Sequence, residues 1–448
     1  MSRKKSKKGD AFGAVLLVLF LIGAAGSIKD KILEKRVDAA EDLKPVAEAS
    51  CTEYISRKGC FTDVDTDEDS EGTYIYTDDT DEDDFCLSDI YDADAPDVPA
   101  LQNDYSYAHG YYYDFLNPAE QKTYDYLYEM LDTFSESIEF PAVSFSEFWN
   151  ARDAVGEDHP EFYWTYDAIR SYSYEDGRIY KAANLYPESA GSDLEYMNGI
   201  ASEVTACIAG LSEYDSYAYI YNYINTYTQY GKAEGVDDQT ISGVFLHGLA
   251  VCAGYSRAFK FLCDKAGLFC INVYGDSYNY DMTEGGPHVW NMIRVDGSYY
   301  WVDVTWGDTE MERTDHMYAD PGYYNYLCAT DETFLKRHVI AYDMKSGDPG
   351  HFIASYPPCV DETYTVYSLM DLQFTSYEDA YCYIHGNLAD NIPYLWMQFD
   401  NTYELDRAVA DLCSSGGLWN YVREEGVSYS GFNYFPEDEF NTLVIEFV

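Results

Sequence analysis

The sequence predicts an α+β protein built around one helix and one β-hairpin. Apolar residues recur with a helical period from Tyr255 to Ala266. Two runs of alternating apolar and polar residues then flank Asp296-Gly297 within residues 285–308. Asp-Gly between alternating runs is the strongest short-range signal of a hairpin. Both periods in one region indicate helices combined with an antiparallel sheet.

Length and charge bound the class of protein. With 448 residues the chain exceeds the usual size of one domain, so from length alone we expect two folded units together with non-globular sequence. It holds 80 acidic and 28 basic residues, which gives a formal net charge of -52. A chain this acidic repels the phosphate backbone, which excludes nucleic-acid binding.

Residues 1–35 have the composition of a targeting segment. Five basic residues lie within the first eight positions, and residues 11–28 then carry no charge. The apolar run is long enough to span a bilayer, and basic residues before it keep the N-terminus in the cytoplasm. We expect a single-pass membrane anchor with the bulk of the chain outside the cell. Small residues at 23–26 also suit a signal peptidase, so a cleaved signal and secretion stay open.

Residues 36–110 are expected to form an extended acidic linker. Residues 61–100 hold 16 acidic residues and neither Lys nor Arg, and such a segment repels itself. This charge would favour cationic partners at a cell surface. Part of the run also matches calcium-loop spacing, at Asp67, Asp69, Glu71, Gly72 and Asp78. No helical pattern flanks that loop, so a solvated linker is the better interpretation.

Residues 111–209 are expected to form a helical lead-in with one hairpin. Asn117, Pro118 and Glu120 have the spacing of an N-cap, a first helical residue and a capping-box acid. Asp176-Gly177 between alternating runs marks the hairpin.

Residues 345–448 are expected to form a small α+β module. Its pattern predicts strand, helix, strand, helix and a final strand, with the first strand at 364–374. We find no catalytic constellation in this module, and His385 is interpreted as a structural histidine.

Cys252 stands at the start of the central helix. A helix N-terminus favours the thiolate form of a cysteine and supplies N–H donors for an oxyanion. Ala253 and Gly254 next to it are small, which we expect to leave room for a substrate. The alternative is a buried, inert cysteine, which is common. None of the eleven cysteines forms a C-x-x-C pair, so a zinc ribbon has no support, and disulfide pairing among the others stays open.

The hairpin register brings a histidine and an aspartate together. With a two-residue loop at Asp296-Gly297, the numbers of opposed residues sum to 593, so His288 and Asp303 become diagonal neighbours on one face. An imidazole can hydrogen-bond a carboxylate at that spacing. Cys252, His288 and Asp303 thus supply the parts of an activated-nucleophile triad.

The central region resembles bacterial transglutaminase-like proteins. The resemblance rests on the phrases "VCAGYSRAFKFLCDKAGL", "GPHVWNMIRVDGSYYWVDVTW" and "YLCATDETFLKRH", which lie in the predicted core, residues 210–344. It implies a papain-like fold, with Cys252 as nucleophile, His288 as base and Asp303 as the orienting carboxylate. It implies no cofactor and no metal.

Two features depart from the family or remain unassigned. The family often continues the aspartate strand with two acids after its tryptophan, whereas here Gly307 precedes Asp308. No oxyanion side chain can be assigned, although Gln229 and Tyr230 lie just upstream of Cys252. His247 is also near Cys252 in sequence but is a poorer base than His288, because it precedes the helix start.

The sequence thus favours an exported cysteine enzyme acting on protein or peptide amides through a thioester with Cys252. Hydrolysis or deamidation is preferred over transamidation, because transamidation requires that water be excluded. The alternative is a membrane-anchored binding or scaffold protein with a vestigial triad, since many of its 48 tyrosines could serve recognition. Substrate identity and oligomeric state stay open.

Overall fold

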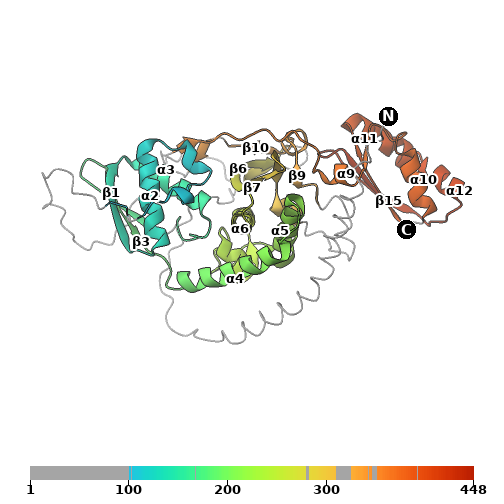
Figure 1. Ribbon diagram of the computed structural model, residues 1–448. Coiled ribbons are helices and arrows are strands. Elements are labelled where there is room, and N and C mark those ends of the chain that lie inside the picture. The colour runs from blue at the N-terminus through green and yellow to red at the C-terminus, as the bar shows by residue number, and fades with distance from the viewer. Residues whose placement is uncertain are drawn as a thin grey trace, which may run out of the picture.

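The computed structural model describes residues 100–448, apart from 102, 167, 279–281, 309–323, 342, 346–350 and 391. The expected anchor, the calcium-loop pattern and most of the acidic linker lie outside the described residues. Within this range, no helix is both long and apolar enough to cross a membrane. Three units lie in a row in Figure 1, in chain order from blue-green to red.

The first unit packs two helices against a small antiparallel sheet of strand order β1-β3-β2. Its elements are η1 (Ser106–Ala108), η2 (Tyr112–Phe115), α2 (Pro118–Asp132), β1 (Ser137–Val143), α3 (Phe145–Asp158), β2 (Ile169–Ser173) and β3 (Ile179–Asn184). Helix α2 begins as predicted, since Asn117 is its N-cap and forms a capping box with Glu120. Strands β2 and β3 form the predicted hairpin, with Gly177 in the left-handed conformation at φ 83°.

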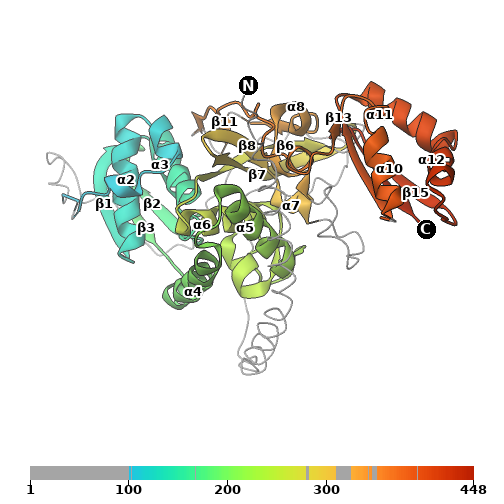
Figure 2. The ribbon, with the colours of Figure 1, turned by 45° about the vertical axis from the view of Figure 1, so that its right-hand side comes forward.

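The central unit is a five-stranded antiparallel sheet with helices packed on it. Its elements are α4 (Ala190–Ile208), α5 (Glu213–Tyr227), β4 (Gln229–Tyr230), η3 (Gly243–His247), β5 (Leu249–Ala250), α6 (Cys252–Lys265), β6 (Cys270–Tyr278), β7 (Gly285–Val295), β8 (Ser298–Val302), α7 (Val304–Gly307), β9 (Leu327–Ala329), α8 (Asp331–Phe334) and β10 (His338–Ile340). The strand order is β10-β6-β7-β8-β9. Figure 2 shows α4, α5 and α6 grouped on one side of this sheet.

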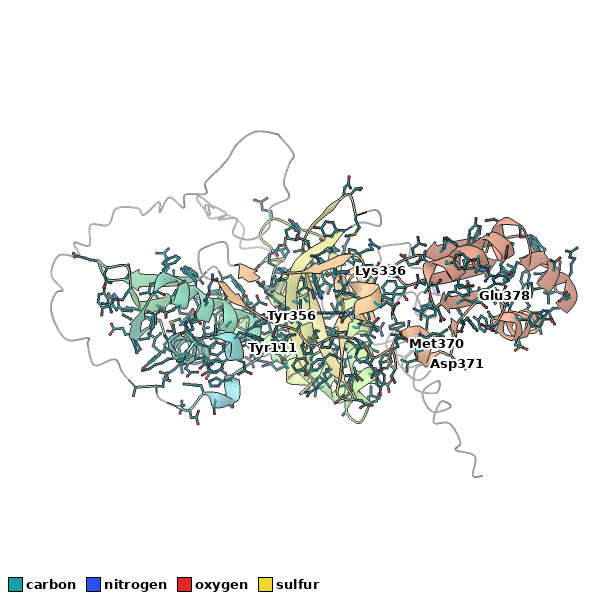
Figure 3. All side chains as sticks on the ribbon, turned by 90° about the horizontal axis from the view of Figure 1, so that it is seen from above. Tyr111, Lys336, Tyr356, Met370, Asp371 and Glu378 are labelled. Carbon is teal, nitrogen blue, oxygen red and sulfur yellow. The ribbon has the colours of Figure 1, made fainter. Side chains whose placement is uncertain are left out.

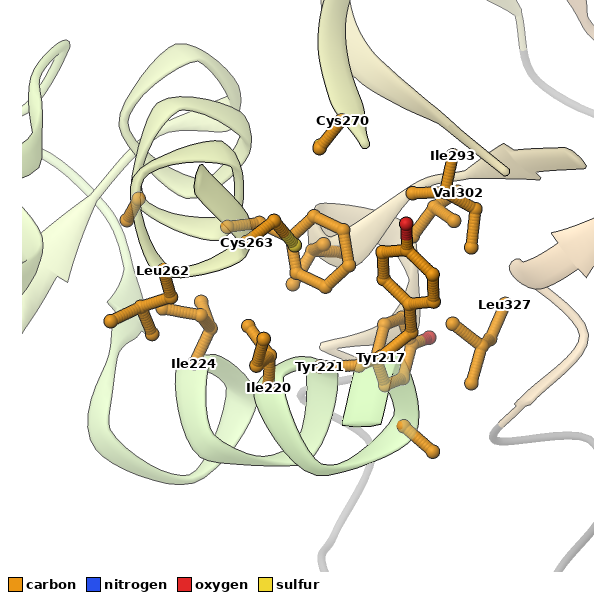
Figure 4. Packing of buried hydrophobic residues seen from close by; sticks show 14 of the residues in the cluster. Tyr217, Ile220, Tyr221, Ile224, Leu262, Cys263, Cys270, Ile293, Val302 and Leu327 are labelled. Carbon is orange, nitrogen blue, oxygen red and sulfur yellow. The ribbon is translucent and has the colours of Figure 1, made fainter. Parts of the chain in front are cut away.

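Helix α6 is buried between α5 and the sheet. Its apolar stripe forms because Phe259, Leu262 and Cys263 recur at helical spacing, and all three are buried. Ile220 and Ile224 of α5 belong to the same buried cluster, and Figure 4 shows Ile224 next to Leu262 and Ile220 below Cys263. Residue Gly267 follows the helix at φ 72°, which confirms the predicted C-terminal glycine.

The β7-β8 hairpin has the predicted register. Val295 pairs with Ser298 and Asn291 with Val302, so each pair of numbers sums to 593. Asp296 and Gly297 form the loop with φ values of 48° and 89°, as a tight two-residue turn requires. The prediction made from Asp-Gly alone is therefore confirmed.

The third unit is a four-stranded sheet, of order β13-β14-β16-β15, covered by helices. The elements after the central unit are β11 (Asp343–Lys345), β12 (His351–Ile353), α9 (Val366–Leu369), β13 (Gln373–Phe374), α10 (Tyr381–Ala389), β14 (Tyr394–Phe399), α11 (Thr402–Ala408), η6 (Val409–Ser414), α12 (Leu418–Glu425), β15 (Phe432–Glu437) and β16 (Thr442–Phe447). The strand predicted at 364–374 is wrong over most of its length. Its apolar residues, including Val366 and Tyr367, instead form a helical turn buried against the central core.

One segment connects all three units. Tyr111 of the first unit donates a hydrogen bond to the Ser355 carbonyl and stacks near Tyr356. Figure 3 shows Tyr356 close to Tyr111 and, farther along the molecule, Met370 near the third unit. Residues 354–372 therefore run along the central unit from one neighbour to the other.

Candidate active site

Cys252 is the first residue of α6, directly after the extended N-cap residue Val251. Valine has no side-chain acceptor, so the first-turn N–H groups are not capped by that side chain. The Cys252 side chain is partly exposed, whereas Cys263, farther along the same helix, is buried. The position therefore combines access with the positive end of a helix dipole.

Gly254 has a different role from the one expected. A Cβ at this position would lie 2.6 Å from the Asp238 carbonyl oxygen and 2.7 Å from the Ala250 Cβ. The space next to the glycine is therefore filled by the loop before η3 and is not free for a substrate. Gly254 allows this loop to pack against the first turn of α6.

Two hydrogen bonds tie α6 to the strand that carries His288. Ser256, one turn after Cys252, donates through Oγ to the Val289 carbonyl at 2.8 Å. Asn291 of β7 donates through Nδ2 to the Ser256 carbonyl at 3.1 Å. All of these groups are buried, so the two contacts fix the start of α6 beside His288. Sequence reasoning did not find either residue, because the helix and the strand are separated in the chain.

His288 and Asp303 are in direct contact. His288 Nε2 lies 2.7 Å from Asp303 Oδ2, which confirms the predicted proximity of the two side chains. Strand β8 ends at Val302, so Asp303 lies just past the ladder and is the N-cap of α7. Its other oxygen, Oδ1, accepts the Trp306 N–H at 2.9 Å. Capping the short helix thus orients the carboxylate toward His288.

The charges of this pair stabilise each other. Burial opposes the positive charge on His288, but the attraction and hydrogen bond of Asp303 outweigh it and raise the pKa of His288 to about 10. The neighbouring Cys252 side chain also contributes to this rise in the pKa of His288. Burial likewise opposes ionisation of Asp303, yet His288 holds the pKa of that carboxyl well below its usual range. At neutral pH the site therefore holds an imidazolium beside a carboxylate.

A second histidine, His338, also contacts Asp303. Its Nε2 lies 3.1 Å from Asp303 Oδ2, and its Nδ1 lies 3.1 Å from the Phe334 carbonyl oxygen. His338 is the first residue of β10, the edge strand that pairs with β6. In the sheet, β6 and β7 lie between β10 and β8. Sequence reasoning missed this residue. His338 is the last residue of the phrase "YLCATDETFLKRH", which resembles the family. That resemblance does not indicate where its side chain lies.

The same three side chains meet the spacing of a metal site. His288, Asp303 and His338 each offer a ligand atom, and these atoms lie within 4.8 Å of one another. Two of the atoms, the Nε2 atoms of the histidines, are directed at the same Asp303 oxygen at hydrogen-bond distance. We therefore interpret the cluster as hydrogen-bonded, with His288 shared between Asp303 and Cys252.

The remaining candidates differ in exposure. Gln229 and Tyr230 form β4, which pairs in parallel with β5 just before Cys252, and both side chains are exposed. His247 is exposed as well. Asp308, the acid that departs from the family pattern, is buried and accepts a hydrogen bond from the Tyr255 hydroxyl. All eight cysteines in the described range are free thiols.

Comparisons with known proteins agree with this geometry. Residues 201–305 match the family described as the transglutaminase-like superfamily, a span that contains Cys252, His288 and Asp303. Residues 201–305 therefore form a transglutaminase-like domain. Its fold is the α+β, papain-like arrangement in which a helix bearing a cysteine packs on an antiparallel sheet that bears the histidine, with the aspartate directly after a strand of that sheet.

Individual relatives share only part of the chain. Kyphoscoliosis peptidase of Mus musculus is 32% identical over 93 residues, which are 19% of this chain and 14% of that protein. A solved structure described as a TGase shows 12% identity and a TM-score of 0.23, covering 34% of this chain and 48% of its own. A solved structure described as a candidate cysteine protease of Cytophaga hutchinsonii shows 12% identity and a TM-score of 0.21, and the match covers 31% of this chain and 61% of that one. The chain thus spans about a seventh of the curated relative's length.

Proposed function

We propose that this chain is a cysteine-dependent enzyme that cleaves amide bonds of proteins or peptides. Cys252 acts as nucleophile, His288 as acid and base, and Asp303 orients His288. The observation that carries the proposal is the position of His288, whose Nε2 lies 2.7 Å from Asp303 Oδ2 and whose raised pKa also reflects the neighbouring Cys252 side chain. Since Asp303 occupies Nε2, Nδ1 is the ring nitrogen that serves Cys252.

The first half of the reaction forms a thioester. The Cys252 thiolate attacks the amide carbon, the S–C bond forms, and the C–N bond then breaks. The leaving nitrogen takes the Nδ1 proton of His288, so ammonia or an amine departs neutral. Asp303 stabilises the imidazolium before this transfer. First-turn N–H groups of α6 are placed to donate to the developing oxyanion, since no N-cap side chain occupies them.

The second half of the reaction returns the thiolate. Water attacks the thioester carbon and gives a proton to His288 Nδ1, the S–C bond breaks, and a carboxylic acid leaves. The sum is amide plus water giving acid plus amine. Hydrolysis is favoured over transamidation because Cys252 is partly exposed, which gives water access to the thioester.

The test measures two products of the full chain with glutamine-containing peptides. We expect ammonia release to exceed incorporation of a fluorescent primary amine, and both to be lost in Cys252→Ala. Cys382→Ala is the matched control, since Cys382 is an exposed cysteine of the third unit. Incorporation without ammonia release would contradict hydrolysis. A Cys252→Ala protein as active as the unchanged chain would contradict the nucleophile.

We also propose that the enzyme acts outside the cell, on the support of the basic residues before position 9 and the uncharged run at 11–28. Proteolysis of intact cells tests this. Protease added outside should degrade residues 111–448 if the chain is exported, and protection equal to that of a cytoplasmic protein would contradict export.

A further inference from the structure

His338 is the buried ionisable group of the site that the proposed mechanism does not use. We propose that His338 is a positioning residue, a neutral imidazole that donates through Nε2 to Asp303 and keeps its carboxylate directed at His288. This role deepens the proposed function and rests on it.

The first argument is the fixed orientation of the ring. His338 is 1% exposed and stacks on Phe334, with ring centroids 3.8 Å apart and an interplanar angle of 16°. The ring centroids of Trp306 and Trp290 lie 4.5 Å and 5.1 Å from the centroid of the His338 ring. Pairing of His338 with Ser277 holds the backbone in the sheet. The ring therefore cannot turn away from Asp303 without disturbing three aromatic neighbours.

The second argument concerns the proton. Both ring nitrogens of His338 face acceptors, the Asp303 carboxylate and the Phe334 carbonyl. A neutral ring has one N–H, and a carboxylate is the stronger acceptor, so the proton belongs on Nε2. The Nδ1–H tautomer would direct an Nε2 lone pair at the Asp303 charge, which is repulsive.

The third argument concerns the charge. Burial lowers the pKa of His338 despite the attraction of Asp303, and the positive His288 lowers it further. The ionisable groups that act on the ring are Asp303 at the end of β8 and His288 on β7. A neutral His338 supplies a hydrogen bond without a second positive charge. The negative charge of Asp303 is thus left for His288 alone.

What this bond achieves is control of one oxygen. Asp303 Oδ1 is held by the Trp306 N–H, while Oδ2 accepts from both histidines. With His338 in place, Oδ2 accepts from a second donor besides His288, so the direction of this oxygen does not depend on His288 alone. His288 therefore meets an acceptor that is already oriented before substrate binds.

The experiment compares three variants of the full chain. His338→Leu removes the donor, His338→Gln keeps a neutral N–H donor, and His385→Gln is a control in the third unit, where His385 contacts Glu425. The readouts are kcat and KM for the glutamine peptide and the pH dependence of alkylation at Cys252, followed by mass spectrometry. Alkylation requires no substrate turnover, so it reports the Cys252–His288 pair directly.

We expect His338→Leu to lower kcat about 10- to 100-fold, the effect of losing one hydrogen bond to a charged group, with KM unchanged. The high-pH limb of its alkylation profile should move to lower pH, because a carboxylate that has lost one of its fixed donors is oriented less firmly and stabilises the His288 imidazolium less. His338→Gln should recover most of both effects, and His385→Gln should change neither. Loss of thermal stability alone would not shift the profile.

Each outcome separates this inference from the proposed function. If Cys252 of the unchanged chain is alkylated no faster than Cys382 at pH 7, the proposed function fails. If Cys252 is activated but His338→Leu keeps the kcat and profile of the unchanged chain, the positioning role is overturned. Nitrogen-15 chemical shifts of the unchanged protein test the tautomer without any variant, and an Nδ1–H form or a cationic ring for His338 would overturn the proposal.

Discussion

Two buried carboxylates from different units of the molecule make a useful comparison. Asp303 lies in the candidate site, and Glu157 ends α3 of the first unit, where it meets α6 and β6. Glu157 accepts from Arg257 at 2.8 Å and from Asn272 at 2.9 Å, and from the hydroxyls of Tyr166 and Tyr274. Burial opposes both charges, yet partners lower both pKa values.

The two carboxylates differ in whether the cationic partner can lose its proton. Arg257 keeps its charge at any pH a protein survives, so the Glu157 cluster can only hold α6 to the first unit. His288 can lose and regain a proton, so the Asp303 cluster can take part in chemistry. One helix carries both Cys252 and Arg257. Under the proposed function, a permanent ion pair fixes the helix and an exchangeable one acts on its first residue.

The largest expected effect is that of Asp303→Asn. The amide can still cap α7, so the fold should persist, but it no longer stabilises a charged His288 or selects its tautomer. We expect kcat to fall about 10⁴-fold. The rate of peptide hydrolysis measures this effect. Asp331→Asn is the control, because Asp331 accepts a hydrogen bond from the Trp301 indole N–H at 2.7 Å and has no part in the proposed triad. A decrease below tenfold would mean that Asp303 is not the orienting group.

The reverse pattern is expected for Arg257→Leu. It leaves Glu157 buried without its cationic partner, so the free energy of unfolding should fall by about 3–5 kcal/mol. Urea denaturation at pH 7 measures this. Adding Glu157→Gln should recover part of the loss, because no unpaired charge then remains. Arg178→Met is the control, since its pair with Asp176 is exposed and should leave stability unchanged. An equal loss in both arginine variants would contradict the comparison.

The two ion pairs should also fail at opposite ends of the pH scale. The pKa of His288 is raised to about 10, so its stabilisation is complete below the unfolded value near 6.5 and is lost as pH rises through 10. The pKa of Glu157 is lowered, so its stabilisation is present above about 4.5 and is lost in acid.

Melting temperatures of the unchanged chain and of His288→Gln test the alkaline half. The variant should be less stable by roughly 2 kcal/mol at pH 6, with the difference vanishing above pH 10. A difference that stays constant from pH 6 to pH 10.5 would show that His288 is not charged in the folded protein.

The same comparison shows what sequence could predict. The register that joins His288 to Asp303 follows from a two-residue Asp-Gly turn, which is a local signal. The start of α6 likewise follows from period and position. Both predictions depend on residues close in the chain, where backbone geometry limits the choices.

Contacts between distant segments could not be predicted. His338 reaches Asp303 because β10 joins the sheet beside β6, a pairing that no turn or period specifies. Arg257 and Glu157 are separated by 100 positions in the chain. The role of Gly254 was misjudged for the same reason, since the loop that fills its space lies outside the helix. Tertiary packing also turned the predicted strand around Tyr367 into a helical turn.

The smallest expected effect concerns a third buried carboxylate, Glu439, near the tip of the β15-β16 hairpin. Its Oε2 accepts from Arg337 at 3.0 Å and from the Tyr326 hydroxyl at 2.9 Å, whereas Oε1 has no hydrogen-bond partner among the described residues. Burial therefore outweighs the arginine and raises the pKa of Glu439 to about 7. Glu157 also has one arginine but accepts from four groups on two oxygens.

An arginine partner is thus insufficient to keep a buried carboxylate ionised, and the number of donors decides. Because its folded pKa is raised, Glu439 costs stability as pH rises from about 4.5 through 7. Glu439→Gln removes this cost and keeps an acceptor for Arg337. The free energy of unfolding of the variant, relative to that of the unchanged chain, should therefore be about 1 kcal/mol higher at pH 8 than at pH 5. Thermal melts at the two pH values measure the difference. Destabilisation that is greater at pH 8 would mean that Glu439 is ionised and fully paired, like Glu157.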